Sequence, residues 1–169
     1  MKNSKLSSIK LFDESNRGAW TLAVSMFSLG EIYDLEKDNL FFRLQIKRGM
    51  DLKELSRIRK QRHLTPKELG SISLGIFNFF EKYPKMLKVT LEDKDWRLFN
   101  IICSETNLTW PDASHLTSAL GIADILLTAD TEFKKESEAF LRNKNLWDEF
   151  RVCKPDEVFD NLRDIGFDY

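Results

Sequence analysis

The sequence predicts an α/β fold with a mostly parallel central sheet. Short strand-like runs such as MLKVTL (86–91) and ADILLT (123–128) alternate with helix-like runs along the chain. ADILLT is almost continuously apolar, which is typical of a parallel strand covered on both faces. Because parallel neighbours need a crossover and a helix is the usual one, we expect a three-layer α/β/α sandwich.

Length, composition and charge favour one domain over residues 1–169. The chain is 42% hydrophobic, which suffices for one sizeable core. Its net charge of −1 provides no overall attraction to nucleic acid or to acidic membranes. Cys103 and Cys153 have no metal-binding spacing, and no run has signal-peptide or membrane-spanning character. A cytoplasmic protein without a membrane partner is expected.

The first third of the chain predicts a helix, a short strand and a second helix. The first helix lies between Ser7 and Trp20 and ends at Arg17–Gly18. A strand is expected over Thr21–Val24, followed by a helix that Ser25 or Ser28 caps. Five residues of this helix are expected to point inward: Leu29, Ile32, Leu35, Leu40 and Leu44.

A basic segment, residues 43–65, is the only break in composition. Arg43 to Arg62 holds eight Lys or Arg and two acids, which predicts one basic helix or two hinged at Gly49, inserted into the domain. Its cations can contact an RNA backbone, can form a solvated helix face, or can flank apolar residues that pack on a partner protein. The candidate RNA contacts are Lys47, Arg48, Arg57, Arg59, Lys60 and Arg62.

The next helices have clear signals at their starts. Thr65-Pro66-Lys67-Glu68 combines a cap, a first-turn proline and an acid. We expect that helix to end near Tyr83–Pro84 and to bury Leu69, Ile72, Ile76, Phe79 and Phe80. Further helices are predicted around Trp96 to Cys103, over residues 112–121, around Phe140, and from Pro155 after a last strand, FRVCK. Most Trp and Phe side chains are expected in the core.

Two aspartates bracket the helix and strand between residues 112 and 130. Asp130 directly follows ADILLT, at the strand end beyond which ligands bind in such sheets, and Asp112 begins the preceding helix. A helix that runs back along the sheet brings both carboxylates to one edge. Each acid also has an ordinary structural interpretation, because Asp112 can cap its helix and Asp130 can serve a turn. Glu31, taken alone, is a surface acid.

The segments Pro111-Asp112-Ala113-Ser114-His115-Leu116-Thr117-Ser118-Ala119-Leu120 and Ala123 to Phe133 resemble the C-terminal half of PIN domains. That family carries a D-A-x-H-L-x-x-A-L helix before a strand ending T-x-D-x-acid-F. Ser25 to Tyr33 is similar to the family's strand-to-helix segment with a central glutamate. The last predicted strand and helix, Phe150 to Leu162, also resemble the last strand and helix of the family. Together these segments span the chain from about Ser7 to Leu162, interrupted by the basic region.

The resemblance implies a metal-dependent ribonuclease that hydrolyses phosphodiester bonds of single-stranded RNA, of the toxin type. It assigns Glu31, Asp112 and Asp130 to a catalytic Mg²⁺ or Mn²⁺ site, with Glu132 as a further metal ligand. Oxygen ligands of this kind suit both ions. It also implies an antitoxin or other protein partner and a homodimer, and it makes His115 a packing residue.

The chain departs from the family pattern at its start. PIN domains open with a strand that ends in the first metal-binding aspartate, whereas MKNSK leads almost at once into a helix. Three explanations stay open: an N-terminally truncated chain, a member that has lost activity, or another acid in that role. The alternative to the ribonuclease is therefore a non-catalytic PIN-like binding or assembly module.

Overall fold

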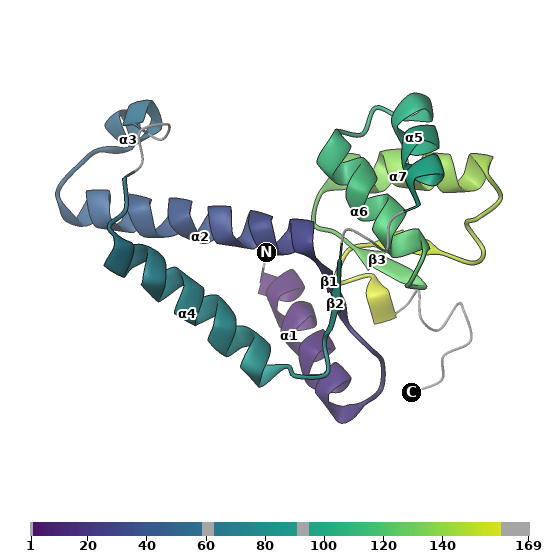
Figure 1. Cartoon of the computed structure of the whole chain (residues 1–169), viewed down its shortest axis with the longest axis horizontal. Coiled ribbons are helices and arrows are strands. Elements are labelled where there is room, and N and C mark those ends of the chain that lie inside the picture. Colours follow the sequence, from purple (N-terminus) through teal and green to yellow (C-terminus); the bar gives the residue numbers. More distant parts are fainter. Residues whose placement is uncertain (1, 59–62, 91–94, 160–169) are drawn as a thin grey trace. The chain divides into compact units, whose positions relative to one another are not determined.

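The computed structural model describes residues 2–58, 63–90 and 95–159 (Figure 1). It is a mixed α/β structure of helices and short parallel strand pairs. The chain divides into two compact units. The α/β unit comprises Met1–Phe27 and Lys85–Tyr169, and the helical unit comprises Ser28–Pro84. The single domain over residues 1–169 stays a prediction, and the insertion predicted at 43–65 falls inside the helical unit.

The helical unit contains most of α2 (Met26–Lys47), all of α3 (Leu52–Ile58) and all of α4 (Pro66–Lys82). Gly49 separates α2 from α3 with a φ of +86°, a left-handed conformation that glycine adopts without strain. Of the two predicted alternatives, one basic helix or two short ones hinged at Gly49, the structure agrees with a break at Gly49, although the first helix is the end of the long α2. The segment 59–62, with three of the predicted RNA contacts, Arg59, Lys60 and Arg62, lies outside the described residues.

The start of α4 matches the sequence prediction in detail. Thr65 Oγ1 accepts a hydrogen bond from the Glu68 N–H at 3.3 Å, and Glu68 Oε2 accepts one from the Thr65 N–H at 2.7 Å. The backbone hydrogen bond from Thr65, followed by that from its hydroxyl, lowers the pKa of the Glu68 carboxyl. This reciprocal capping box satisfies two of the N–H groups that a helix start leaves unpaired.

In the α/β unit, α1 (Lys2–Arg17) is followed by four short strands that form two parallel pairs. β1 (Ala23–Ser25) pairs with β2 (Leu87–Val89), and β3 (Ile125–Leu127) pairs with β4 (Arg151–Cys153). Each pair forms a two-stranded sheet among the described residues. The parallel pairing is as predicted. Three predicted strands are found in shortened form, whereas the first, predicted at Thr21–Val24, is shifted along the chain and ends at Ser25.

The β3–β4 pair is covered on both faces. On one face, Leu126 and Val152 contact a core built from α5 (Trp96–Glu105), α6 (Trp110–Leu120) and α7 (Thr131–Asn143). On the other, Ile125, Leu127 and Cys153 join a second cluster that includes Leu11 of α1. Burial on both faces explains the near-continuous apolar run of β3.

The cysteines differ in environment. Cys103 is exposed and Cys153 is buried, and both are free thiols. Desolvation by burial raises the pKa of the Cys153 thiol to about 12. Cys153 therefore behaves as a small apolar core residue, whereas the Cys103 side chain is exposed.

Several apolar side chains predicted to be inside are exposed instead. Leu35 and Phe77 are each 59% exposed, Trp96 and Trp110 are each 63% exposed, and Ile32 and Phe79 are also exposed. Helical periodicity groups side chains on a face, but it cannot specify which faces a neighbouring element covers. The inward assignment of Ile32, Leu35 and Phe79, and the core assignment of these tryptophans, were wrong.

Two predictions concern the end of the chain and the membrane. Residues 155–157 form a turn rather than the start of a helix, helical residues begin at Val158, and 160–169 lie outside the described residues.

Over the described ranges, none of the helices has both the length and the apolar composition needed to cross a bilayer.

An ion-pair network joins α7 to the segment after β4. Lys134 Nζ lies 3.0 Å from Glu138 Oε1 and 3.1 Å from Glu157 Oε2. Desolvation opposes the charge of Lys134, but hydrogen bonds to both glutamates outweigh it and raise its pKa. Desolvation likewise opposes the charge of Glu157, while hydrogen bonds from the Lys154 N–H and from Lys134 lower its pKa.

We predict that Lys134→Met lowers the free energy of unfolding at neutral pH and that this loss shrinks in acid. The pKa of Glu157 is below its ordinary 4.5 in the folded state, so its contribution is complete above pH 4.5 and is lost as pH falls through the folded pKa. Urea unfolding of both proteins between pH 3 and 7 measures the effect. Lys135→Met, at an exposed neighbour on α7, is the control. A difference that stays constant across this range contradicts the prediction.

Candidate functional site

Asp112 lies in the first turn of α6, whose N-cap is Thr109 rather than Asp112 itself. Asp112 is half-buried, and its Oδ2 accepts a hydrogen bond from Thr109 Oγ1 at 2.6 Å. Its Oδ1 accepts no hydrogen bond from the residues that the structure describes. Asp112 therefore supports the helix start and keeps one carboxylate oxygen open.

Asp130 is the N-cap of α7 and is exposed. Its Oδ1 accepts the N–H groups of Glu132 at 2.8 Å and of Phe133 at 3.0 Å, which satisfies two donors of the first turn. Its own N–H donates to Thr128 Oγ1 at 3.0 Å. Within the described part of the chain, Oδ2 receives no hydrogen bond. Asp130 thus also combines a capping role with an open oxygen.

The path of the chain brings both aspartates to the same edge of the α/β unit. The helix α6 packs on β3 and leads into it through a short connection, Gly121–Asp124. A helix that covers the strand it immediately precedes must run in the opposite direction to it. The N-terminal end of α6, with Asp112, therefore lies toward the carboxyl end of β3, which Asp130 follows. Ligands of α/β sheets bind at this edge.

The carboxyl end of β1 meets the same helix. Ser25 Oγ, at the end of β1, lies 3.4 Å from Nδ1 of His115, which is three residues after Asp112 and so one turn along α6. The ring of Phe27, in the first turn of α2, lies 6.0 Å from the His115 ring. The packing role expected of His115 is therefore observed, together with a polar contact that its sequence position did not reveal.

Trp110 is a residue of this edge that the sequence analysis assigned to the core. Its ring packs edge-to-face on Phe27, with centroids 5.6 Å apart, yet 63% of the side chain is exposed. Trp110 is the first residue of α6, directly before Pro111. An exposed aromatic face in the same helical turn as Asp112 can stack on a nucleobase.

The remaining predicted site residues have the following places. Glu132 is exposed in the first turn of α7, two residues after Asp130. Glu31 is exposed on α2 and belongs to the helical unit. Lys47, Arg48 and Arg57 are also exposed residues of that unit. The chain path thus directs Asp112, Asp130 and Glu132 toward one edge of the α/β unit, but among the described residues they do not form a group of three that could hold a metal ion. The predicted RNA contacts belong to the helical unit.

The donor chemistry of this edge fits a hard divalent cation. Carboxylate oxygens are the ligands that Mg²⁺ and Mn²⁺ prefer, and Mg²⁺ usually keeps several waters, so one or two protein oxygens are an adequate anchor. Across residues 2–58, 63–90 and 95–159, no group of three or more His, Cys, Asp or Glu side chains has an arrangement that could hold a metal ion. The two open oxygens are therefore the part of the predicted site that this structure contains.

Comparison with models of known families, with curated proteins and with solved structures found no match. The resemblance to PIN domains stays a prediction from the residues quoted above.

We predict that Asp130→Ala lowers the free energy of unfolding by about 1 kcal/mol, whereas Asp130→Asn changes it by less than half as much, because asparagine also caps helices. Urea unfolding of the two variants measures the difference. Asp95 provides a matched reference, since it caps α5 in the same way by accepting the N–H groups of Arg97 and Leu98. Equal losses for Ala and Asn at Asp130 would show that its charge, not its cap, stabilises the fold.

Proposed function

We propose that the α/β unit is a PIN-like ribonuclease domain that hydrolyses single-stranded RNA with Mg²⁺ or Mn²⁺. The observation that supports this proposal best is that Asp112 and Asp130 lie at one edge of the unit, each with one carboxylate oxygen open. A cation can bind the open oxygens without breaking the cap at Asp130 or the hydrogen bond from Thr109 to Asp112.

In this proposal Asp112, Asp130 and Glu31 hold the cation, and Glu132 adds a further oxygen. When bound, the cation supplies Lewis-acid stabilisation of the phosphodiester and lowers the pKa of a bound water. The inclusion of Glu31 rests on the resemblance of Ser25 to Tyr33 to the family's segment with a central glutamate.

The proposal includes the finer fold, in which the two strand pairs belong to one parallel sheet between two helical layers. Two observations support it. His115 of α6 contacts the end of β1, and α6 also packs on β3, so one helix reaches both pairs. In addition, the β3–β4 pair has apolar clusters on both of its faces.

The chain's own residues have separate tasks in this function. Trp110 offers a face on which a base of the RNA stacks, and the exposed cations Lys47, Arg48 and Arg57 neutralise phosphates. The carboxylates repel the RNA backbone until a cation binds, so RNA binding and metal binding at this edge support each other. A toxin-type role, with an antitoxin partner and a homodimer, remains a prediction of the resemblance alone.

A non-catalytic PIN-like binding or assembly module is the second candidate. It is favoured by the capping contacts, because they account for the presence of both Asp112 and Asp130 without any metal. The two functions differ in what happens when a carboxylate becomes a carboxamide. Asparagine preserves the cap but is a poorer ligand for a hard cation.

We predict that the full chain cleaves an unstructured, fluorescently labelled RNA in a Mn²⁺-dependent reaction. The single-turnover rates of Asp112→Asn and Asp130→Asn are expected to be about tenfold to hundredfold lower than that of the wild type. Even outer-shell partners of a metal are worth roughly this factor. Calorimetric titration with Mn²⁺ on the same proteins measures the loss of metal binding without relying on activity.

Asp95→Asn is the matched control for this experiment, because it changes a capping aspartate of the same geometry at the start of α5. It is expected to retain the wild-type rate. Cleavage that survives in Asp112→Asn and Asp130→Asn would overturn the assignment of these residues. A wild-type chain that neither binds Mn²⁺ nor cleaves RNA would overturn the ribonuclease and support the binding module.

We predict that Trp110→Ala weakens the binding of single-stranded RNA about fivefold to a hundredfold, since stacking on an aromatic ring is worth roughly 1–3 kcal/mol per base. Fluorescence anisotropy with the Asp130→Asn protein measures binding without cleavage. Trp96→Ala is the control: Trp96 is equally exposed and is likewise the first residue of its helix, α5. Equal weakening by both substitutions would show that Trp110 is not a specific base contact.

A further inference from the structure

Helices α4 and α6 begin with the same sequence pattern, a threonine followed three residues later by an acid. Thr65 and Glu68 begin α4, and Thr109 and Asp112 begin α6. In both pairs the threonine is the N-cap and is exposed, and the acid is half-buried. The acid of α6 is shorter by one methylene group. The contacts of α4 therefore show what a longer acid does at this position of a helix start.

The glutamate of α4 satisfies two donors at once. Glu68 Oε2 accepts hydrogen bonds from the Thr65 N–H at 2.7 Å and from the Thr65 hydroxyl at 2.8 Å. In return, Thr65 Oγ1 accepts the N–H of Glu68 at 3.3 Å, which completes the capping box. All of these contacts stabilise the helix start, so a structural role is sufficient to explain an acid at position 68.

The aspartate of α6 makes a different set of contacts. Its Oδ2 accepts a hydrogen bond from the Thr109 hydroxyl at 2.6 Å, a distance typical of a hydroxyl bonded to a charged carboxylate. The cap from the Asp112 N–H to Thr109 Oγ1 is long, at 3.5 Å. The N–H of Thr109 donates to no group in the described part of the chain. The hydroxyl therefore holds the carboxylate more firmly than it caps the helix.

Glutamate would suit the start of α6 better than aspartate does. One more methylene group would let the carboxylate reach back to the Thr109 N–H, as Glu68 reaches the Thr65 N–H in α4. The carboxylate would then turn toward the helix start and away from the edge of the α/β unit. Because aspartate leaves the capping box incomplete, capping alone does not account for this residue at position 112. Presentation of the open Oδ1 at the edge does account for it.

Asp112 and Asp130 differ in the donors that orient them. As the N-cap of α7, Asp130 accepts two backbone N–H groups on its Oδ1. Asp112 accepts a side-chain hydroxyl instead. The backbone of its turn is fixed, since Ala113 is fully buried and donates its N–H to the Thr109 carbonyl at 2.9 Å. The remaining freedom of Asp112 is rotation about its two side-chain torsions, which the Thr109 hydroxyl restricts.

We propose that Thr109 is a positioning residue of the proposed metal site. Its hydroxyl holds Oδ2 of Asp112, so that the open Oδ1 keeps the orientation in which it binds the cation. Partners of this kind orient the ligands of a metal, and their removal typically weakens metal binding about tenfold to a hundredfold. Because this inference rests on the proposed ribonuclease function, its test separates the failure of one from the failure of the other.

Calorimetric titration with Mn²⁺ tests this role in three threonine variants of the full chain, whose folding is checked by urea unfolding. Thr109→Val removes the hydroxyl with little change of shape and is expected to weaken Mn²⁺ binding about tenfold to a hundredfold. Thr109→Ser keeps the hydroxyl and should bind Mn²⁺ within about threefold of wild type. Thr65→Val removes the equivalent hydroxyl of α4 and should leave Mn²⁺ binding unchanged. A serine variant as weak as the valine variant would overturn the role of the hydroxyl.

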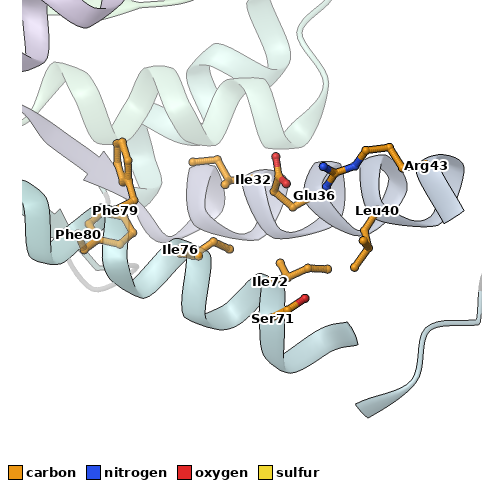
Figure 2. A pocket seen from close by; sticks show the side chains of 10 residues that line it. Ile32, Glu36, Leu40, Arg43, Ser71, Ile72, Ile76, Phe79 and Phe80 are labelled. Atoms are coloured by element: carbon orange, nitrogen blue, oxygen red, sulfur yellow. The ribbon is translucent and has the colours of Figure 1, made fainter. Parts of the chain in front are cut away.

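Thr65→Val is a matched control because both helices are anchored beyond their caps. Ile72 and Ile76 of α4 point toward α2 across a pocket of about 420 Å³ (Figure 2). In α6, Leu116 is fully buried in the core of the α/β unit. Loss of the cap hydroxyl is therefore expected to lower the midpoint of urea unfolding for both valine variants. If Thr109 acted on stability alone, the two valine variants would bind Mn²⁺ equally.

Asp112→Glu changes stability and metal binding in opposite directions. The longer acid is expected to complete the capping box at Thr109 and so to raise the midpoint of urea unfolding. It also draws the carboxylate back to the helix start, so Mn²⁺ binding and single-turnover RNA cleavage should both fall at least about tenfold. Because the variant is expected to be more stable than wild type, unfolding cannot explain this loss.

The outcomes separate the role of Thr109 from the proposed function. Wild-type binding of Mn²⁺ that either Thr109→Val or Asp112→Glu leaves unchanged would overturn the role of Thr109 and leave the ribonuclease proposal standing. Equal weakening by Thr109→Val and Thr65→Val would do the same, because the effect would then be one of stability. A wild-type chain that does not bind Mn²⁺ would overturn the proposed function, and the role of Thr109 with it.

Discussion

Burial of the β3–β4 pair on both faces is the constraint on which the α/β unit depends. Successive side chains of a strand point to opposite faces, so Leu126 and Val152 need one apolar cover and Ile125, Leu127 and Cys153 need another. Helices α5, α6 and α7 supply the first, and Leu11 of α1 contributes to the second. With both faces covered, the ends of the strands are where polar chemistry has access to solvent. The position of Asp130 follows from this packing rather than from any requirement of a metal.

The sequence predicted best those features whose causes are local. The capping box at Thr65, the break at Gly49 and the apolar strand before Asp130 each depend on a few adjacent residues, and each was found in the structure. The predicted starts of helices were less accurate, because the N-cap can lie one turn before the residue that the sequence suggests. Asp112 was expected at the beginning of α6, but Thr109 is the cap, and Asp112 occupies the first turn.

The exposure of large apolar residues could not be predicted because it depends on which surfaces come together. Trp96 and Trp110 have the composition and spacing of core residues, yet both begin their helices and are 63% exposed. Leu35 and Phe77 show the same effect within the helical unit. Periodicity describes one helix at a time, whereas burial is a property of pairs of elements.

The two aspartates of the candidate site illustrate why sequence alone could not decide between a cap and a metal ligand. A carboxylate has two oxygens, and a capping contact uses the lone pairs of one. At Asp112 and Asp130 the capping contacts fix the orientation of the carboxylate, and a fixed orientation is also what a metal ligand requires. These contacts therefore do not argue against metal binding. Because they already order the side chains, less conformational entropy is lost when a cation binds. The property that distinguishes a cap from a metal ligand is the negative charge of the carboxylate. Asparagine, which lacks this charge, still caps a helix but is a poor ligand for a cation.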